Sequence, residues 1–446
     1  MASLMSSAPI HELEAATLKT VRNRVIPILL SAFIISYLDR INVGFAAIDM
    51  NRDLGLTAEM FGFGAGLTFI AYSLFELPSN LALERFGARK WLARIMITWG
   101  LIGCSMALVT TPAMFYTARF LLGAAEAGLF PGVILYLTYW FPKRHRARYI
   151  SLFALGIPMS NVLGSPVSGL LLDMDGILGM KGWQWLFILE AVPAVLLGIC
   201  VLIFLVDRPD RAKWLSAEQK QWLNGELDRD RQAQQSVQRI HAWKMIADRR
   251  VLLLAAVFFL TGVPSYGMGL WMPQIVSSLG FSNVATGFLT AVPFTFGAIA
   301  MVVWGNRSDA RQERVWHAAA SASLAFVGLS VGAMASTLAL QMIGICIAAS
   351  GIYGIKGPFL SLVSETFESS NAAAGIALVA TLGNLSGFAA PYMVGIILER
   401  TENYQLGLTA LATSALFGSV LLLVSAKKSW LVRHERSNVP QPVEPV

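Results

Sequence analysis

Charge is scarce in this sequence. Only 14% of its 446 residues are Asp, Glu, Lys or Arg, and 55% are hydrophobic, whereas about 25% of an ordinary soluble chain is charged. Much of the surface therefore cannot face water. Apolar stretches of about 18 or more residues recur, and each can cross about 30 Å of hydrocarbon as a helix. Because these stretches are continuous rather than alternating, they predict membrane-spanning helices and not a membrane barrel.

Several chemical signatures are also missing. The three cysteines lie inside apolar segments and lack the spacing of a disulfide framework or a zinc site. No phosphate-binding loop of the G-x-x-x-x-G-K-[ST] type occurs, which argues against ATP-driven transport. Residues 328–332 match a hydrolase nucleophile pattern, but no strand precedes them, so we assign them to helix packing. We therefore expect no enzymatic activity, no catalytic residue, no metal and no cofactor. We also expect no cleavable signal peptide, because the first apolar segment is too long.

Twelve apolar segments of spanning length follow one another along the chain. The expected spans are 24–48, 59–80, 90–109, 113–138, 147–172, 185–207, 250–275, 283–304, 315–335, 338–361, 372–398 and 405–426. The polar stretch 208–249 interrupts the series, and Ser216 with Gln219 forms a capping box that predicts a surface helix there. We therefore predict an all-α membrane protein with twelve transmembrane helices in two six-helix halves. The expected divisions are a tail at 1–23, a first half at 24–207, a central loop at 208–249, a second half at 250–426 and a tail at 427–446.

The positions of the basic residues predict how these helices are oriented. With both termini in the cytoplasm, the inner segments hold most of the 34 Lys and Arg residues, and the outer loops hold only Arg52, Lys181 and Arg400. Such an excess on one side is the usual topogenic signal. It accounts for the net charge of +7 without a nucleic-acid partner. We expect a multi-pass protein of the cell inner membrane.

A weak repeat relates the two halves. Asn80-x-x-x-Glu84-Arg85 follows the second span, and Gly305-x-x-x-Asp309-Ala310-Arg311 follows the eighth. Both stretches put an acid and basic residues on a tight inner loop. A parallel repeat is a known transporter architecture, although any inner loop also collects basic residues.

Four motifs carry a resemblance to a known family. They are YLDRINVGFA (37–46), RFLLGAAEAGLFPG (119–132), WMPQIV (271–276) and GNLSGFAAPYMVG (383–395). The chain resembles the major facilitator superfamily and, within it, the anion:cation symporter family. The resemblance implies a monomeric carrier whose halves rock about a central site. Similar permeases carry 4-hydroxyphenylacetate, tartrate, phthalate or sugar acids.

Ionisable residues lie inside two of the predicted spans. Asp39 and Arg40 belong to the first span, and Arg119 and Glu126 belong to the fourth, about two turns apart on nearly one face. Each such residue costs at least about 2.5–3.5 kcal/mol near the bilayer centre. They could be salt bridges that only hold helices together.

A functional role follows from the sum of these four charges, which is zero. An incoming carboxylate could take an arginine from its acidic partner, since the planar guanidinium binds a carboxylate with two hydrogen bonds. The acid that has lost its arginine partner would then take up a proton, so that the anion and the proton bind cooperatively. The resemblance implies the same roles, with Asp39 and Glu126 as proton carriers and Arg40 and Arg119 as anion or coupling residues.

Further side chains are candidates for the wall of the site. The resemblance implies that Tyr37 and Tyr72 line the cavity, although packing roles are equally open. Lys356 either faces the site or reaches toward the cytoplasmic face. Asn384 either bonds the substrate or bonds across helices, and Trp271 is either a cap or, as we favour, an ordinary interfacial aromatic.

We therefore predict import of a small organic anion together with a proton, with the anion, the proton and membrane lipid as partners. The cargo class is a sugar acid, a hydroxy acid or an aromatic acid, and the proton stoichiometry stays open because the role of Lys356 is open. The alternative within transport is a proton-coupled exporter of drugs or metabolites. The two arginines favour an anion over a cationic or lipophilic drug. A membrane-embedded enzyme or receptor is a third alternative, but no catalytic cluster or large soluble domain is visible.

Overall fold

The computed structural model describes residues 8–235, 247–367 and 372–427 of the chain. Within them every regular element is a helix, and twelve helices are long and apolar enough to cross a membrane. The prediction of an all-α protein with twelve spans is thus confirmed. The first half contains α1 (Ala8–Leu54), α2 (Ala58–Phe86), α3 (Ala88–Ser105), α4 (Pro112–Glu126), α5 (Leu129–Trp140), α6 (Lys143–Leu172) and α7 (Gly182–Phe204).

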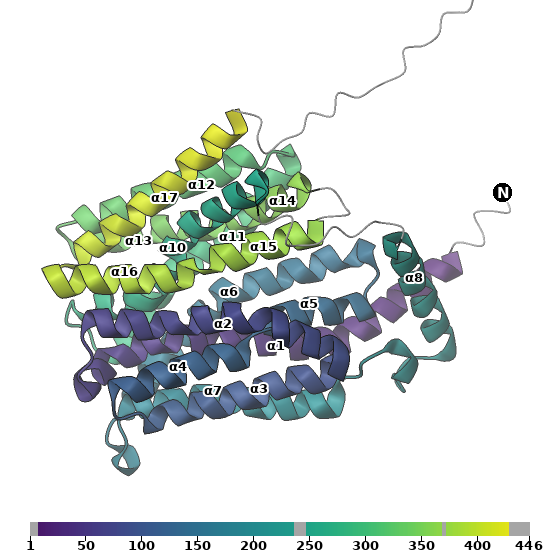
Figure 1. The fold of residues 1–446 in the computed structure, drawn as a ribbon, viewed down its shortest axis with the longest axis horizontal. Coiled ribbons are helices and arrows are strands. Elements are labelled where there is room, and N and C mark those ends of the chain that lie inside the picture. The colour runs from purple at the N-terminus through teal and green to yellow at the C-terminus, as the bar shows by residue number, and fades with distance from the viewer. Residues whose placement is uncertain (1–7, 236–246, 368–371, 428–446) are drawn as a thin grey trace, which may run out of the picture.

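The second half follows a surface helix. This helix is α8 (Ala217–Gln235), and the Ser216–Gln219 capping box at its start is formed in both directions. The second half contains α10 (Arg249–Ser277), α11 (Asn283–Arg311), α12 (Val315–Met334), α13 (Leu338–Gly354), α14 (Lys356–Thr366), α15 (Ala372–Asn384), α16 (Ser386–Thr401) and α17 (Tyr404–Lys427). Figure 1 shows the halves as two bundles side by side, with α8 and the start of α1 at one end. We call this the α8 end.

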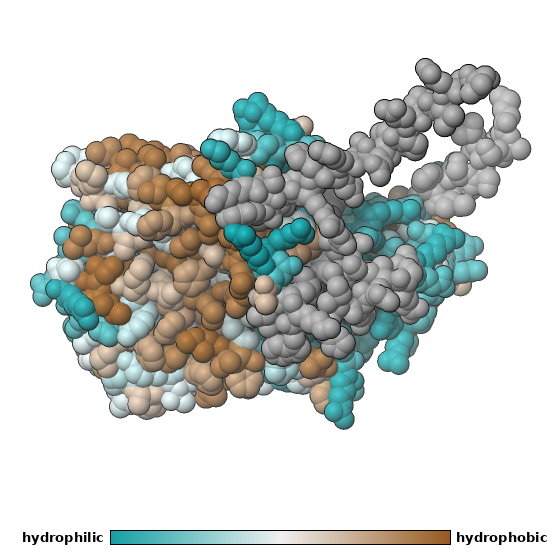
Figure 2. Space-filling model, turned by 45° about the horizontal axis from the view of Figure 1, so that its top comes forward, coloured by the Kyte–Doolittle hydropathy of each residue, from teal (hydrophilic) through white to brown (hydrophobic). Residues whose placement is uncertain are grey.

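Apolar side chains form a belt around the two bundles. In the view of Figure 2, brown surface covers the middle of the molecule, and teal surface lies mainly at its right, with smaller teal patches at the left edge and the top. Large hydrophobic side chains such as Leu74, Ile203 and Val303 are more than half exposed. An exposed apolar surface of this kind is stable in lipid rather than in water.

The first helix is longer than its apolar segment. The predicted tail 1–23 is helical from Ala8 onward, and residues 1–7 lie outside the described part of the chain. Thr17 and Val21 are fully buried, and Glu14 pairs with Arg144 of α6 at 2.8 Å. Hydropathy alone misses this extension because packing against the polar end of α6 stabilises it.

Three of the twelve spans are broken within the membrane-spanning part. The fourth span breaks between α4 and α5, where Gly128 has φ +87°, a conformation that costs any residue with a Cβ. The tenth span is interrupted for one residue at Ile355 and the eleventh at Leu385, and both residues keep right-handed helical φ and ψ. Three predicted site residues stand beside these breaks: Glu126, Lys356 and Asn384. Interrupted helices leave backbone polar groups free to face a cavity.

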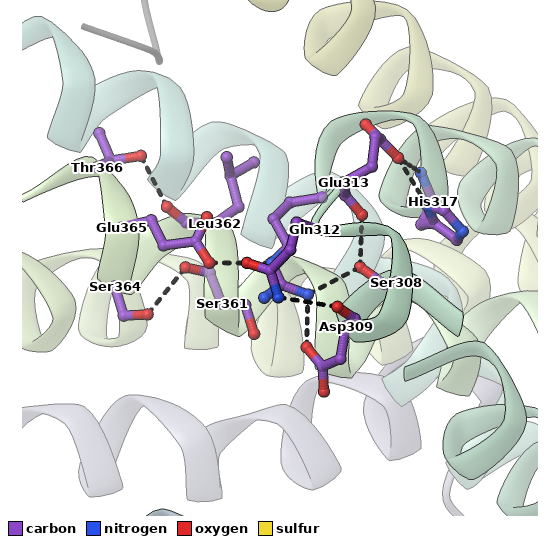
Figure 3. Close-up of polar contacts among 11 residues, drawn as sticks. Ser308, Asp309, Gln312, Glu313, His317, Ser361, Leu362, Ser364, Glu365 and Thr366 are labelled. Atoms are coloured by element: carbon purple, nitrogen blue, oxygen red, sulfur yellow. Dashed lines mark hydrogen bonds and ion pairs between the residues drawn. The ribbon is translucent and has the colours of Figure 1, made fainter. Parts of the chain in front are cut away.

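Each half carries a charged loop at the α8 end. In the second half Arg314 pairs with Asp309 and, at 2.9 Å, with Glu365 of α14. Burial lowers the pKa of the Arg314 guanidinium, but its bonds to these two acids outweigh burial and raise it. Figure 3 shows Asp309 and Glu365 converging on this loop from different helices. In the first half, Asp207 from the segment after α7 accepts a bond from the Arg89 backbone at 2.9 Å.

The two halves touch each other mainly at the end opposite α8. There α2 packs on α16, α6 on α11 and α1 on α10. The Tyr392 hydroxyl donates to Glu59 at 3.2 Å, and Asn283 donates to Asp173 at 3.0 Å. A Cβ on Gly62 would collide with the backbone of α16. The helices of the two halves diverge toward the α8 end in Figure 1.

Candidate functional site

An ion pair joins the first and fourth spans. The Arg40 Nε atom donates to both carboxylate oxygens of Glu126, at 2.9 and 3.1 Å. Ser36, one turn before Arg40, also donates to Glu126. The Glu126 side chain is only 2% exposed, whereas Arg40 is 14% exposed. The pair therefore has a buried acid and a base that an incoming molecule can reach.

Two tyrosines stack against the guanidinium of Arg40. The Arg40 Cζ atom lies 5.1 Å from the ring centre of Tyr37 and 4.8 Å from that of Tyr72. Such cation–π contacts contribute about 0.5–2 kcal/mol each. They hold the guanidinium in place without using its hydrogen-bond donors. The two tyrosines thus contact a predicted anion-binding residue, and their contact with a cargo stays a prediction.

Arg119 is buried with most of its hydrogen-bonding capacity unused. It is 0% exposed, and its Nη2 atom makes one long contact of 3.5 Å to the Ala65 carbonyl. Its Nε and Nη1 atoms have no partner in the described part of the chain. The charges within electrostatic range are those of Asp39, Glu126 and Arg40. A buried cation without acceptors is costly, and a carboxylate with two free oxygens would supply them.

Asp39 does not join the cluster formed by Arg40 and Glu126. Its carboxylate accepts from the Trp99 indole at 2.8 Å and from the Asn42 amide at 3.1 Å. It is 3% exposed and points toward α3 and α7. Adjacent residues on a helix lie about 100° apart, so Asp39 and Arg40 cannot both face Glu126. Asp39 reaches Arg119 through electrostatics but not through a hydrogen bond.

The second half contributes a tyrosine and an amide. The Tyr266 hydroxyl of α10 donates to the Asn384 side-chain oxygen at 3.3 Å. The Tyr266 ring packs on Phe69 of α2 at 4.7 Å between centres, and Tyr266 lies within electrostatic range of Arg40 and Glu126. Asn384 thus makes a bond between helices in this structure, next to the Arg40–Glu126 pair. This bond leaves its NH₂ group free for a cargo.

Lys356 is a second intramembrane cation without an acidic partner among residues 8–235, 247–367 and 372–427. Its ammonium lies 5.7 Å from the ring centre of Phe258 on α10. Gly383 of α15 packs closely on the same ring. The side chain is half-buried. Lys356 therefore lies where the helix breaks of the second half meet α10, and its contact with a cargo stays a prediction.

Trp271 differs from the favoured expectation. It is 1% exposed and donates to the Pro391 carbonyl at 3.3 Å. Its ring meets Phe61 of the opposite half edge-on at 5.2 Å. The reading as an interfacial aromatic at the lipid boundary is therefore wrong, because WMPQIV lies in the contact between the halves.

Two acids inside the spans were missed by the sequence reasoning. Glu76 of α2 lies within electrostatic range of Arg40 of α1. Glu190 of α7 is 6% exposed and accepts from Ser168 at 2.7 Å. The signal that identifies Asp39 and Glu126, a charge within an apolar span, also applies to both. Across the described residues no three His, Cys, Asp or Glu side chains gather to hold a metal ion.

Comparison with known proteins identifies the family. A model of the Major Facilitator Superfamily matches residues 29–391. The chain belongs to the major facilitator superfamily. A solved bacterial homologue of the human lysosomal transporter Spinster, in an inward-facing conformation, has the same fold, with a TM-score of 0.76 over 91% of this chain and 97% of that chain at 14% identity. The chain is thus a multi-pass membrane transporter, and the family resemblance drawn from the four motifs is confirmed.

Two full-length relatives of this superfamily have different names. A protein of Agrobacterium vitis, provisionally named a tartrate transporter, is 44% identical over 94% of this chain and 93% of its own length. A quinolone resistance transporter of Acinetobacter baumannii is 38% identical over 97% of this chain and all of its own length. The two names represent an organic anion and a drug, which are the two cargo classes weighed from the sequence.

Proposed function

We propose that this transporter imports a small organic anion, a hydroxy acid such as tartrate, together with a proton. The observation that supports the proposal most is the buried Arg119, whose Nε and Nη1 donors have no acceptor. It lies within range of the Arg40–Glu126 pair. Guanidinium groups favour carboxylates because the fork of donors matches two oxygens. A cationic or lipophilic drug that has no carboxylate offers no such acceptors.

Proton coupling follows from competition for the arginines. A carboxylate that bonds Arg119 and Arg40 draws Arg40 away from Glu126. Glu126 is 2% exposed, so its charge without a partner is costly, and the carboxyl takes up a proton. Asp39, within range of Arg119, responds in the same way when the anion neutralises Arg119. Anion and proton therefore increase each other's affinity.

The second half suits the distal part of a hydroxy dicarboxylate. Lys356 has no acidic partner among the described residues, and the Asn384 NH₂ group and the Tyr266 hydroxyl lie in the same half. One carboxylate would bond the arginines, the second would neutralise Lys356, and the amide would bond a hydroxyl. Groups from both halves would then close on one molecule. This arrangement supports a dianion carried with at least one proton.

The conformation supports access from one side. Contacts between the halves cluster at the end away from α8, and the basic loops lie at the α8 end, which the Lys and Arg distribution assigns to the cytoplasm. We therefore assign the α8 end and both termini to the cytoplasm of a cell inner membrane, with a monomer rocking about the central site.

Uptake by reconstituted vesicles tests the proposal. Purified protein in liposomes should concentrate radiolabelled L-tartrate when the outside is acidic, and a protonophore should abolish the accumulation. Phthalate, 4-hydroxyphenylacetate and a sugar acid serve as competitors to define the class. Saturable uptake of none of these anions, or accumulation that ignores the protonophore, would contradict the proposal.

Drug export is the second candidate, because the Acinetobacter relative covers this chain over nearly its whole length. The same vesicles distinguish the two functions. An exporter would accumulate a fluorescent quinolone in inside-out vesicles energised with protons, and expression would raise quinolone tolerance. The anion proposal predicts neither result.

A further inference from the structure

Glu190 is a buried acid that the proposed transport steps do not use. It lies on α7, is 6% exposed, and accepts one hydrogen bond, from Ser168 of α6 to its Oε1 atom at 2.7 Å. Its Oε2 atom receives no hydrogen bond from any described residue. The side chain that interacts with this carboxyl group from α1 is Asn42.

Asn42 leaves a second acceptor without a donor. The side chain is 0% exposed, and its amide nitrogen donates to Asp39 at 3.1 Å. Its own Oδ1 atom has no partner in the described part of the chain. Each buried acceptor that lacks a donor costs about 1–3 kcal/mol. This cluster therefore has two acceptors, Glu190 Oε2 and Asn42 Oδ1, and lacks a donor for them.

The surrounding charges also oppose a second negative charge. Burial opposes a charge on Asp39, and the hydrogen bonds that it accepts from Trp99 and Asn42 support its ionised form against that cost. The charged groups that act on Asp39 are Glu126 and Arg119 of α4. Among the described residues, the charged group that acts on Glu190 is Asp39, and the side chain of α6 that bonds Glu190 is Ser168. Two buried carboxylates within electrostatic range of each other cannot both ionise at low cost.

We propose that Glu190 is a proton-holding site: it carries a proton on Oε2 and donates it to the Asn42 Oδ1 atom. This single proton then satisfies both unpaired oxygens, Glu190 Oε2 and Asn42 Oδ1. It also removes the repulsion between Glu190 and Asp39, because Glu190 becomes neutral. Oε1 remains the carbonyl oxygen and keeps its bond from Ser168. With Glu190 neutral, the charges of Asp39, Arg40, Arg119 and Glu126 sum to zero.

The protonated state of Glu190 does not depend on the proposed function, whereas its constancy during transport rests on that function. Glu190 keeps its proton throughout the cycle, so Asp39 and Glu126 remain the groups whose charge changes during transport. The resting state of Glu190 is independent of the cargo. It can therefore be tested on purified protein without any substrate.

Infrared spectroscopy at neutral pH provides the test. A protonated carboxyl group has a C=O stretch that lies apart from the carboxylate bands and shifts in D₂O. The wild-type protein should show this band, and Glu190→Gln should lose it, while Asp39→Asn and Glu126→Gln should keep it. Ser168→Ala should move the band to higher wavenumber, because the carbonyl loses its hydrogen bond.

Each other outcome overturns the inference. Absence of the band in the wild type, or its survival in Glu190→Gln, would show that Glu190 is ionised. A band that appears only after sodium is removed would assign the cluster to a bound cation instead. A folded Glu190→Gln variant should elute as one sharp peak. If it does not, the Ser168→Ala shift decides alone, and an unshifted band there overturns the inference.

Transport in the Glu190→Gln variant tests the second part separately. Because glutamine imitates the neutral acid, the variant should still concentrate L-tartrate against its gradient. If the wild type shows no uptake at all, the proposed cargo is wrong and the infrared result still stands. If the wild type concentrates tartrate and Glu190→Gln does not, Glu190 changes its charge during the cycle and the inference fails.

Discussion

Arg119 is buried in an unfavourable environment, and a bound anion would supply the hydrogen-bond acceptors that it lacks. Its Nε and Nη1 donors lack acceptors within the described ranges, although the side chain is fully buried. Arg40, by contrast, is already bonded to Glu126. The two arginines therefore differ in role: Arg119 is free to bind the anion first, and Arg40 transmits the event to the acid.

Substitution of Arg119 tests the first role. Arg119→Ala should weaken anion binding at least about 30-fold, since loss of one partner of a buried charged pair costs about 2–5 kcal/mol. Arg119→Lys should restore only part of the affinity, because lysine keeps the charge and loses the planar fork. Equilibrium binding of L-tartrate to purified protein measures both. Wild-type affinity in Arg119→Ala would contradict the assignment.

The sequence predicts which charged residues lie inside the spans but not the directions in which their side chains point. The sequence puts Arg119 and Glu126 on nearly one helix face, and the structure pairs Glu126 with Arg40 of the first span. The rotation of Asp39 away from that pair depends on one residue step of the helix. Its partner Trp99 comes from a span whose rotation the sequence does not reveal.

The helix breaks set the positions of the polar site residues. Glu126 ends α4, Lys356 begins α14 and Asn384 ends α15. Apolar run lengths predict each of these three spans as continuous, because hydropathy measures length and polarity rather than backbone geometry. Only Gly128 gives a local hint, since its φ of +87° favours glycine.

Replacement of Gly128 tests the break in the fourth span. Gly128→Ala should lower stability by at least about 1–2 kcal/mol, the cost of a left-handed conformation for a residue with a Cβ, because the new Cβ would also collide with Ser79. Thermal unfolding in detergent measures the change. Gly225→Ala is the matched control, because Gly225 lies inside α8 with nothing within 4 Å. The control should gain about 0.5–1 kcal/mol. Equal unfolding of Gly128→Ala and the wild type would refute the argument.

The whole molecule is held together where its halves meet, at the end away from α8. Those contacts involve backbone close to backbone, as at Gly62, and bonds such as Tyr392 to Glu59. The sequence predicts two halves from the polar stretch 208–249 and the charged loops. It does not predict which ends of the halves touch, because carriers that rock use the same sequence for both arrangements.

A methyl group added at the contact between α2 and α16 should favour the arrangement in which the halves are apart at this end. A Cβ on Gly62 collides with the Pro391 carbonyl, so Gly62→Ala should separate the halves at that end. Spin labels at cysteines replacing Arg52 and Glu402 measure the separation once the native cysteines are changed to serine. Gly62→Ala should give longer distances, and Gly269→Ala, where nothing lies within 4 Å, should not. Identical distances in all three proteins would oppose the closed-end account.

Proton uptake on anion binding measures the coupling at the Arg40–Glu126 pair most directly. In weakly buffered solution, addition of L-tartrate to the purified carrier should take up protons, which a pH indicator records as alkalinisation. Glu126→Gln should still bind tartrate and should take up fewer protons, because glutamine cannot be protonated in this range. Binding without proton uptake in the wild type, or undiminished uptake in Glu126→Gln, would contradict the account.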